Sequence, residues 1–81
     1  MPVVLRWQGY RFFFFSNEGD PQEPIHVHIR KGDKVAKVWV LPEVGVAESH
    51  GMTTAELKQL TQAVETHVEL IERRWHEHFD H

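Results

Sequence analysis

Two histidines lie two residues apart in the segment IHVHIR, which spans residues 25–30. Successive side chains of a β-strand point to opposite faces of the sheet, so His26, His28 and Arg30 would share one face. The aliphatic side chains between them would share the other face, which predicts a strand that is buried on one side only. The polar side would present imidazole and guanidinium groups, which can bind a metal ion, exchange protons or hold a phosphate.

A metal site is the first of these interpretations. Two imidazoles on one strand can reach the same ion, and the acidic segment 18–23 could add a carboxylate ligand. A third nitrogen could come from His50 or from the histidines within residues 76–81. Zinc takes three or four ligands, however, and the strand pattern indicates two. The alternative is that His26 and His28 form hydrogen bonds to neighbouring groups or to solvent. Whether a metal ion binds therefore stays unknown, and no cofactor is expected.

Acid–base chemistry on a phosphodiester is the second interpretation. A histidine can transfer protons near neutral pH, and Arg30 and Lys37 could hold the phosphate. This interpretation makes His26, His28 and Lys37 the candidate catalytic residues, as in a small ribonuclease. The sequence offers no obvious second carboxylate or tyrosine for such a site, so the existence of any catalytic activity stays open.

The third interpretation concerns the whole polar face of the predicted sheet. Its residues are Arg6, Arg11, Phe13, Phe15, His26, His28, Arg30, Lys37 and Trp39. Aromatic rings interleaved with basic groups can stack on bases and neutralise phosphates, which is typical of proteins that bind single-stranded RNA or DNA. The alternative is that a partner protein or a second copy of the chain covers these aromatic side chains, and we favour this alternative for so short a chain.

The chain has 81 residues and no cysteine. This length allows one domain with a small core, which a partner or dimerisation would help to stabilise. The absence of cysteine excludes disulfides, thiol nucleophiles and zinc sites built from thiolates. No apolar run approaches the roughly 18 residues that a membrane-spanning helix needs, and the N-terminus lacks the pattern of a signal peptide. We therefore expect a cytoplasmic protein with no membrane partner.

The net charge of −3 is unevenly distributed along the chain. Residues 1–41 contain six lysines and arginines against four acidic residues, whereas residues 42–81 contain three against eight. The basic charge thus lies in the half that is predicted to form strands, where it could create a modest anion-binding surface. The chain as a whole lacks the strong basic excess of a typical nucleic-acid-binding protein.

The first predicted hairpin consists of residues 3–7 and 10–16, which flank a Gln8-Gly9 turn. Glycine adopts positive φ angles readily, so a two-residue loop is expected. Counting outward from the loop gives the pairs Trp7–Tyr10, Leu5–Phe12 and Val3–Phe14. These six side chains would form one apolar face toward the core, with Val4 on the opposite face.

The second predicted hairpin consists of residues 25–31 and 34–41, which flank a Gly32-Asp33 turn. Counting outward from this turn places His28 opposite Lys37 and His26 opposite Trp39. A shift of one residue would mix apolar and polar side chains on both faces, which supports this register. Residues 44–47 are predicted to add a short edge strand.

A long helix is predicted over residues 53–79. Thr53 and Glu56 match a capping box, in which both side chains satisfy free amides of the first turn. One amphipathic stripe then follows at spacings of three and four, with His67 expected at the edge of the core. It consists of Leu57, Leu60, Val64, His67, Val68, Ile71, Trp75 and Phe79. The sequence thus predicts a single α+β domain over residues 1–81. Its antiparallel sheet of four to five short strands, within about 3–48, would pack against one long C-terminal helix.

The segment FFFSNE at residues 13–18, followed by EPIHVHI at residues 23–29, matches the signature of a known family. In that signature an aromatic strand and a Ser-Asn turn precede Glu-Pro-x-His-Val-His. The chain therefore resembles domain of unknown function 4160 (DUF4160), a small bacterial family, over nearly its whole length. The residues that match the family's polar pattern are Ser16, Asn17, Glu23, His26, His28 and Lys37.

The resemblance implies little about activity, because none is established for the family. Its genes often neighbour a second small domain, in an arrangement similar to toxin–antitoxin pairs. By that resemblance the protein would be an interaction module with a protein partner, and would act on RNA or regulate a protein that does. The candidate ligand-binding residues are then Ser16, Asn17, Glu23, Arg30 and Trp39. The alternatives are an RNase-like phosphodiesterase and a metal-binding protein, each using His26 and His28.

Overall fold

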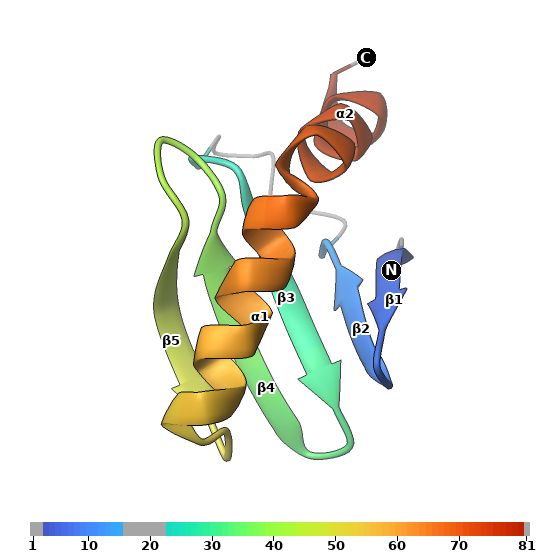
Figure 1. Cartoon of the computed structure of the whole chain (residues 1–81). Coiled ribbons are helices and arrows are strands. Elements are labelled where there is room, and N and C mark those ends of the chain that lie inside the picture. The colour runs from blue at the N-terminus through green and yellow to red at the C-terminus, as the bar shows by residue number, and fades with distance from the viewer. Residues whose placement is uncertain (1–2, 16–22, 81) are drawn as a thin grey trace.

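The computed structural model of the protein describes residues 3–15 and 23–80. Within these ranges, five antiparallel strands form one sheet in the order β1-β2-β3-β4-β5, and two helices follow. The elements are β1 (Val3–Trp7), β2 (Tyr10–Phe13), β3 (His26–Lys31), β4 (Lys34–Trp39), β5 (Gly45–His50), α1 (Thr54–Thr66) and α2 (Val68–Phe79). Figure 1 shows α1 lying across β3 and β4, so the protein has the predicted α+β fold with an antiparallel sheet.

The second hairpin has the predicted register. All predicted pairs within β3 and β4 are observed, among them His28 opposite Lys37 and His26 opposite Trp39. Gly32 in the turn has a φ of 63°, a left-handed conformation that glycine adopts without steric penalty. The aliphatic side chains of both strands accordingly face α1 and form the centre of the core.

The first hairpin follows the prediction only next to its turn, where both inner pairs form. A β-bulge between Val3 and Leu5 then places Val3 opposite Phe13, so the predicted pair of Val3 with Phe14 is wrong. Because a bulge interrupts the alternation of side chains, Val4 packs against the core and Val3 is 44% exposed. β2 ends at Phe13, short of the predicted end at residue 16, and Phe14 turns into the core.

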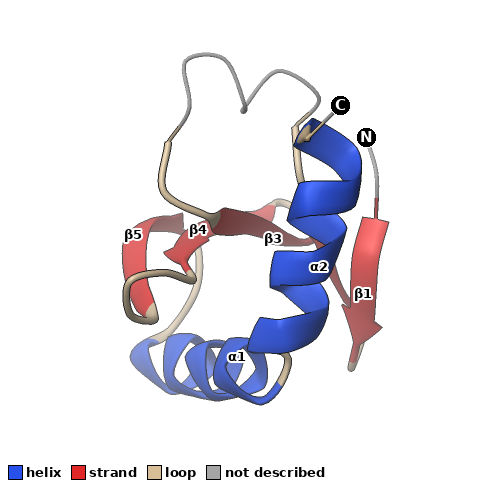
Figure 2. Ribbon diagram, turned by 90° about the horizontal axis from the view of Figure 1, so that it is seen from above, coloured by secondary structure: helices blue, strands red, loops and turns tan. Residues whose placement is uncertain are grey.

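The prediction of one long helix is wrong, because the chain forms two helices that meet at His67. His67 has φ −113° and ψ 21°, and its Nδ1–H donates to the Ala63 carbonyl oxygen at 2.7 Å. A continuous helix over residues 54–79 would be about 39 Å long, whereas strands of six residues span about 20 Å. The break turns α2 across the end of the sheet (Figures 1 and 2), where Ile71 and Trp75 are buried. In the described part of the chain, neither helix is long and apolar enough to cross a membrane.

The carboxylate of Glu56 links the start of α1 to the sheet through hydrogen bonds. The predicted capping box is present, with the Glu56 amide donating to Thr53 Oγ1 and the Thr53 amide donating to Glu56 Oε1, each at 3.0 Å. The Tyr10 hydroxyl and Lys34 Nζ also donate to Glu56 Oε2, at 2.5 Å and 3.1 Å. These donors, the Tyr10 hydroxyl foremost, lower the pKa of Glu56 to about 2, and the bond to Glu56 raises the pKa of Tyr10.

Acid should therefore destabilise the fold through Glu56. Its pKa is lower in the folded chain than in the unfolded one, so its stabilising effect is complete above about pH 4.5 and is lost as the pH falls toward about 2. We expect Glu56→Gln to lower the melting temperature by several degrees at pH 7, and to have a much smaller effect near pH 2, where about half of the folded chains carry a protonated Glu56. Thermal unfolding over this pH range measures both, with Glu65→Gln on the exposed side of α1 as the control. A difference that stays constant with pH would contradict the prediction.

Candidate functional site

The side of the sheet opposite the core carries the polar residues that the sequence predicts. We call this side the outer face, and its residues are Arg6, Arg11, Phe13, Phe15, His26, His28, Arg30, Lys37, Trp39, Glu48 and His50. The strand register separates them into two groups. The arginines and His50 lie toward the hairpin turns, whereas His26 and His28 with their aromatic neighbours lie toward the end of the sheet that α2 crosses.

Three arginines form a row across neighbouring strands, because Arg6 is opposite Arg11 and Arg11 is opposite Arg30. We call these three residues the arginine row. All three are exposed, and none pairs with a carboxylate within residues 3–15 and 23–80. A hollow of about 130 Å³ lies between Arg11 and Arg30 and is also lined by Val3 and Phe13. Like charges opposite one another destabilise a sheet, so a bound anion would relieve a repulsion that the free protein carries.

His26 is fully buried, contrary to the prediction that it is presented on a polar face. Its ring packs between Trp39 and Trp75, with ring centroids 5.4 Å and 5.2 Å away. Its Nδ1 lies 2.9 Å from the Pro24 carbonyl oxygen, which can only accept, so Nδ1 carries the proton. Because α2 buries it, His26 supports its neighbours on the outer face by packing against them.

His28 is the more accessible of the two strand histidines and lies in an aromatic cluster. Its ring centroid is 4.2 Å from that of Phe15 and 5.8 Å from that of Phe13. Phe15 is 41% exposed, whereas Phe13 is buried. The run of four phenylalanines is thus divided between the core and the outer face, and Phe15 is the member that a partner could contact.

Lys37 is held between two other predicted site residues. Its Nζ lies 3.3 Å from Glu23 Oε1 and 4.7 Å from the centroid of the Trp39 ring. Lys37 therefore contacts both Glu23 and Trp39. The ammonium group is already paired with a carboxylate, however, which weakens it as an anchor for an added phosphate.

A pocket of about 210 Å³ opens beside His28. Its lining comprises Phe15, His28, Val35, Ala36, Lys37, Glu48, Ser49 and His50. β5 places Glu48 opposite Lys37 and His50 opposite Val35. The predicted edge strand ends at Ala47 and therefore leaves Glu48 out of the site. The observed strand β5 continues to His50, and its register places Glu48 beside Lys37.

Two predicted ligand-binding residues, Ser16 and Asn17, lie outside the described residues. Among the residues that the structure does describe, no three histidine, aspartate or glutamate side chains form a group that could hold a metal ion. The rings of His26 and His28 adjoin, with centroids 5.3 Å apart. The pair that the strand spacing predicts is therefore present, without a third ligand from the described part of the chain.

Comparison with models of known protein families gave a match. A family model described as a domain of unknown function (DUF4160) matches residues 9–76. The matched range runs from the first hairpin turn into α2 and includes every residue of the outer face except Arg6. A search of curated proteins and a search of solved structures each found no match.

Proposed function

This chain belongs to the DUF4160 family of domains of unknown function, and on that basis we propose that it is an interaction module of a toxin–antitoxin-like pair. Its outer face binds an acidic segment of the partner protein in the cytoplasm. The arginine row carries this proposal. Three neighbouring guanidinium groups have no carboxylate partner in the described residues, and each can form two parallel hydrogen bonds to an aspartate or glutamate side chain.

The apolar residues beside the arginine row favour a protein over RNA as the partner. Val3 is 44% exposed and lines the same hollow as Arg11, and Phe15 is 41% exposed beside Phe13. Protein interfaces are enriched in arginine and aromatic side chains, which contribute most of their binding energy. The chain also lacks the strong basic excess that is typical of nucleic-acid-binding proteins, which must neutralise many phosphates at once.

The product of the gene adjacent to this one is the partner to test. We expect calorimetry to show a saturable complex whose affinity falls at least tenfold between about 0.05 and 0.5 M salt, because salt screens charge pairs. Absence of a complex, or an affinity that does not change with salt, would contradict the proposal. Gel filtration of the chain alone reveals whether a second copy, rather than the neighbouring gene product, covers the outer face.

The pocket beside His28 favours a second candidate function, cleavage of RNA by acid–base chemistry. His28 and His50 line it together with Lys37 and Glu48, and imidazoles can act as general acid and general base. If the protein is such an enzyme, His28→Ala should lower the cleavage rate of a labelled single-stranded RNA by about a hundredfold or more. His76→Ala, at an exposed position of α2, should leave it unchanged, and no cleavage by the native chain would exclude this function.

A further inference from the structure

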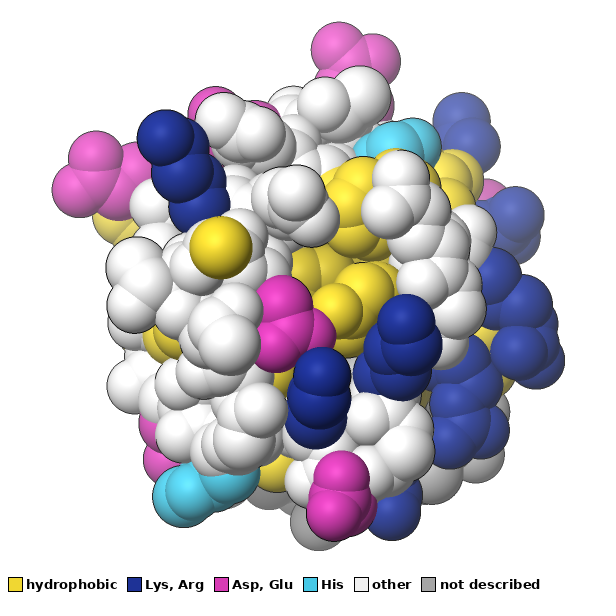
Figure 3. Space-filling model, turned by 60° about the horizontal axis from the view of Figure 1, so that its bottom comes forward, with side chains coloured by type: hydrophobic (Ala, Val, Ile, Leu, Met, Phe, Trp, Pro, Cys, Tyr) yellow, Lys and Arg dark blue, Asp and Glu magenta, His cyan; other side chains and the backbone are white. Residues whose placement is uncertain are grey.

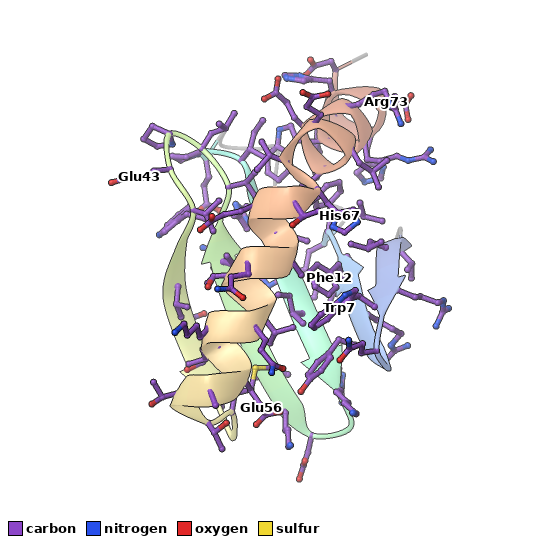
Figure 4. All side chains as sticks on the ribbon, viewed as in Figure 1. Trp7, Phe12, Glu43, Glu56, His67 and Arg73 are labelled. Atoms are coloured by element: carbon purple, nitrogen blue, oxygen red, sulfur yellow. The ribbon has the colours of Figure 1, made fainter. Side chains whose placement is uncertain are left out.

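A second hollow lies on the helix side of the sheet, between the first hairpin turn and α1. Its volume is about 310 Å³, and its lining includes Trp7, Gln8, Gln59, Gln62, Thr66 and His67. We call it the hairpin–helix pocket. Figure 4 shows Trp7 and His67 on the same side of α1, with Phe12 labelled between them. Figure 3 shows a recess with hydrophobic side chains at its floor, bordered by uncharged, basic and acidic side chains. The sheet separates this pocket from the outer face.

Two backbone irregularities of the chain meet at the hairpin–helix pocket. Gln8 has a φ of 49°, a left-handed conformation in which glycine and asparagine are favoured and glutamine is strained. His67 interrupts the helix, with φ −113° and ψ 21°. Strained backbone concentrates at functional sites, and of these two residues Gln8 is the one whose φ is strained. Both irregular residues contribute their side chains to the lining of the same pocket.

The lining of the pocket combines polar and apolar side chains and includes no lysine, arginine, aspartate or glutamate. Three glutamine amides supply both donors and acceptors, and the indole of Trp7 supplies a flat apolar surface for stacking. The Thr66 hydroxyl donates to the Gln62 carbonyl oxygen, so its lone pairs can still accept. Because no lysine, arginine, aspartate or glutamate lines the pocket, a charged group bound there would have no counterion among the lining residues.

This combination matches a planar, neutral ligand with a hydrogen-bonding edge. Glutamine forms paired hydrogen bonds with the edge of adenine, and nucleobases stack on aromatic side chains. The volume of about 310 Å³ is at the lower end of small-molecule sites, so it suits one nucleoside. We propose that the hairpin–helix pocket binds an adenine base, stacked on Trp7 and held by the glutamine amides. This site does not depend on the partner or the chemistry of the outer face.

An NMR titration of the full chain with adenosine, adenosine monophosphate and uridine tests the proposal. Adenosine at millimolar concentration should cause saturable shifts of the Trp7 indole N–H and the His67 ring. The monophosphate should bind with similar affinity, because the base alone is recognised, and uridine at least tenfold more weakly. Absence of saturable shifts, equal binding of uridine, or binding of the monophosphate at least tenfold tighter than adenosine would each overturn the proposal.

Two substitutions separate binding from folding. Gln8→Gly removes an amide of the pocket at a position whose φ suits glycine, so the melting temperature should stay the same or rise while adenosine binding weakens at least tenfold. Gln62→Ala, at an exposed position of α1, should weaken binding to a similar extent. Lys58→Ala, on α1 but outside the pocket, should bind adenosine normally. Full binding by both glutamine variants would overturn the proposal.

Discussion

Replacement of both Arg11 and Arg30 with glutamate should weaken binding of the acidic partner at least a hundredfold. Each arginine is expected to form a charge-assisted hydrogen bond with a carboxylate, worth about 1.5–3 kcal/mol, and the loss of two such bonds corresponds to more than a hundredfold in Kd. The substitution also introduces repulsion, because glutamates at these opposed positions would face the acidic segment of the partner. Calorimetric titration with the neighbouring gene product measures the change.

A control variant with the same change in net charge distinguishes the loss of the arginine contacts from a general effect of charge on affinity. Lys58→Glu combined with Arg73→Glu alters the charge by the same amount, but both side chains are exposed on the helices rather than on the outer face. We expect this control to reduce affinity less than threefold, through long-range repulsion alone. If both double variants lose affinity equally, the arginine row is not the binding surface. Both double variants should also fold normally, because two opposed glutamates repel each other no more than the two opposed arginines that they replace, and all four substituted positions are exposed.

The parts of the fold that the sequence predicted correctly are those specified by local signals. In the second hairpin, the Gly32-Asp33 turn and a strict alternation of aliphatic and polar residues agree on one register, and that register is observed. In the first hairpin, Val3 and Val4 are both aliphatic, so alternation cannot indicate which of them faces the core. The bulge that decides this in favour of Val4 has no sequence signal of its own.

The features that the sequence did not reveal depend on contacts between distant elements. The apolar spacing of three and four residues continues through His67, so periodicity gives no indication that the helix breaks there. That break depends on the size of the sheet that the helices must cover. The burial of His26 follows from it, because Trp75 reaches the His26 ring only when α2 turns across the end of β3. The alternation of side chains along the strand, taken alone, therefore predicts an exposed His26.

Substitution of Trp75 by alanine should have the largest effect on stability of any single change in α2. Its side chain is 1% exposed, and its ring contacts those of Phe14, Phe79 and His26, with centroids 4.4 to 5.2 Å apart. Removal of a buried tryptophan costs about 3–5 kcal/mol. A chain of 81 residues has a total stability of about 4–12 kcal/mol, so this variant should be close to unfolding in water. Urea denaturation at 25 °C measures the loss.

Trp39→Ala is the matched control, since Trp39 also contacts His26 but lies half-buried on the outer face. We expect it to cost at most about 2 kcal/mol. Trp75→Phe should remain folded and retain most of the stability, which makes it suitable for following the His26 ring by NMR. If α2 is what buries His26, the ring should exchange its Nδ1 proton faster in Trp75→Phe than in the native chain. The idea would be contradicted if Trp75→Ala and Trp39→Ala lost the same unfolding free energy and the His26 Nδ1 proton exchanged no faster in Trp75→Phe. In that case Trp75 would not be what buries His26.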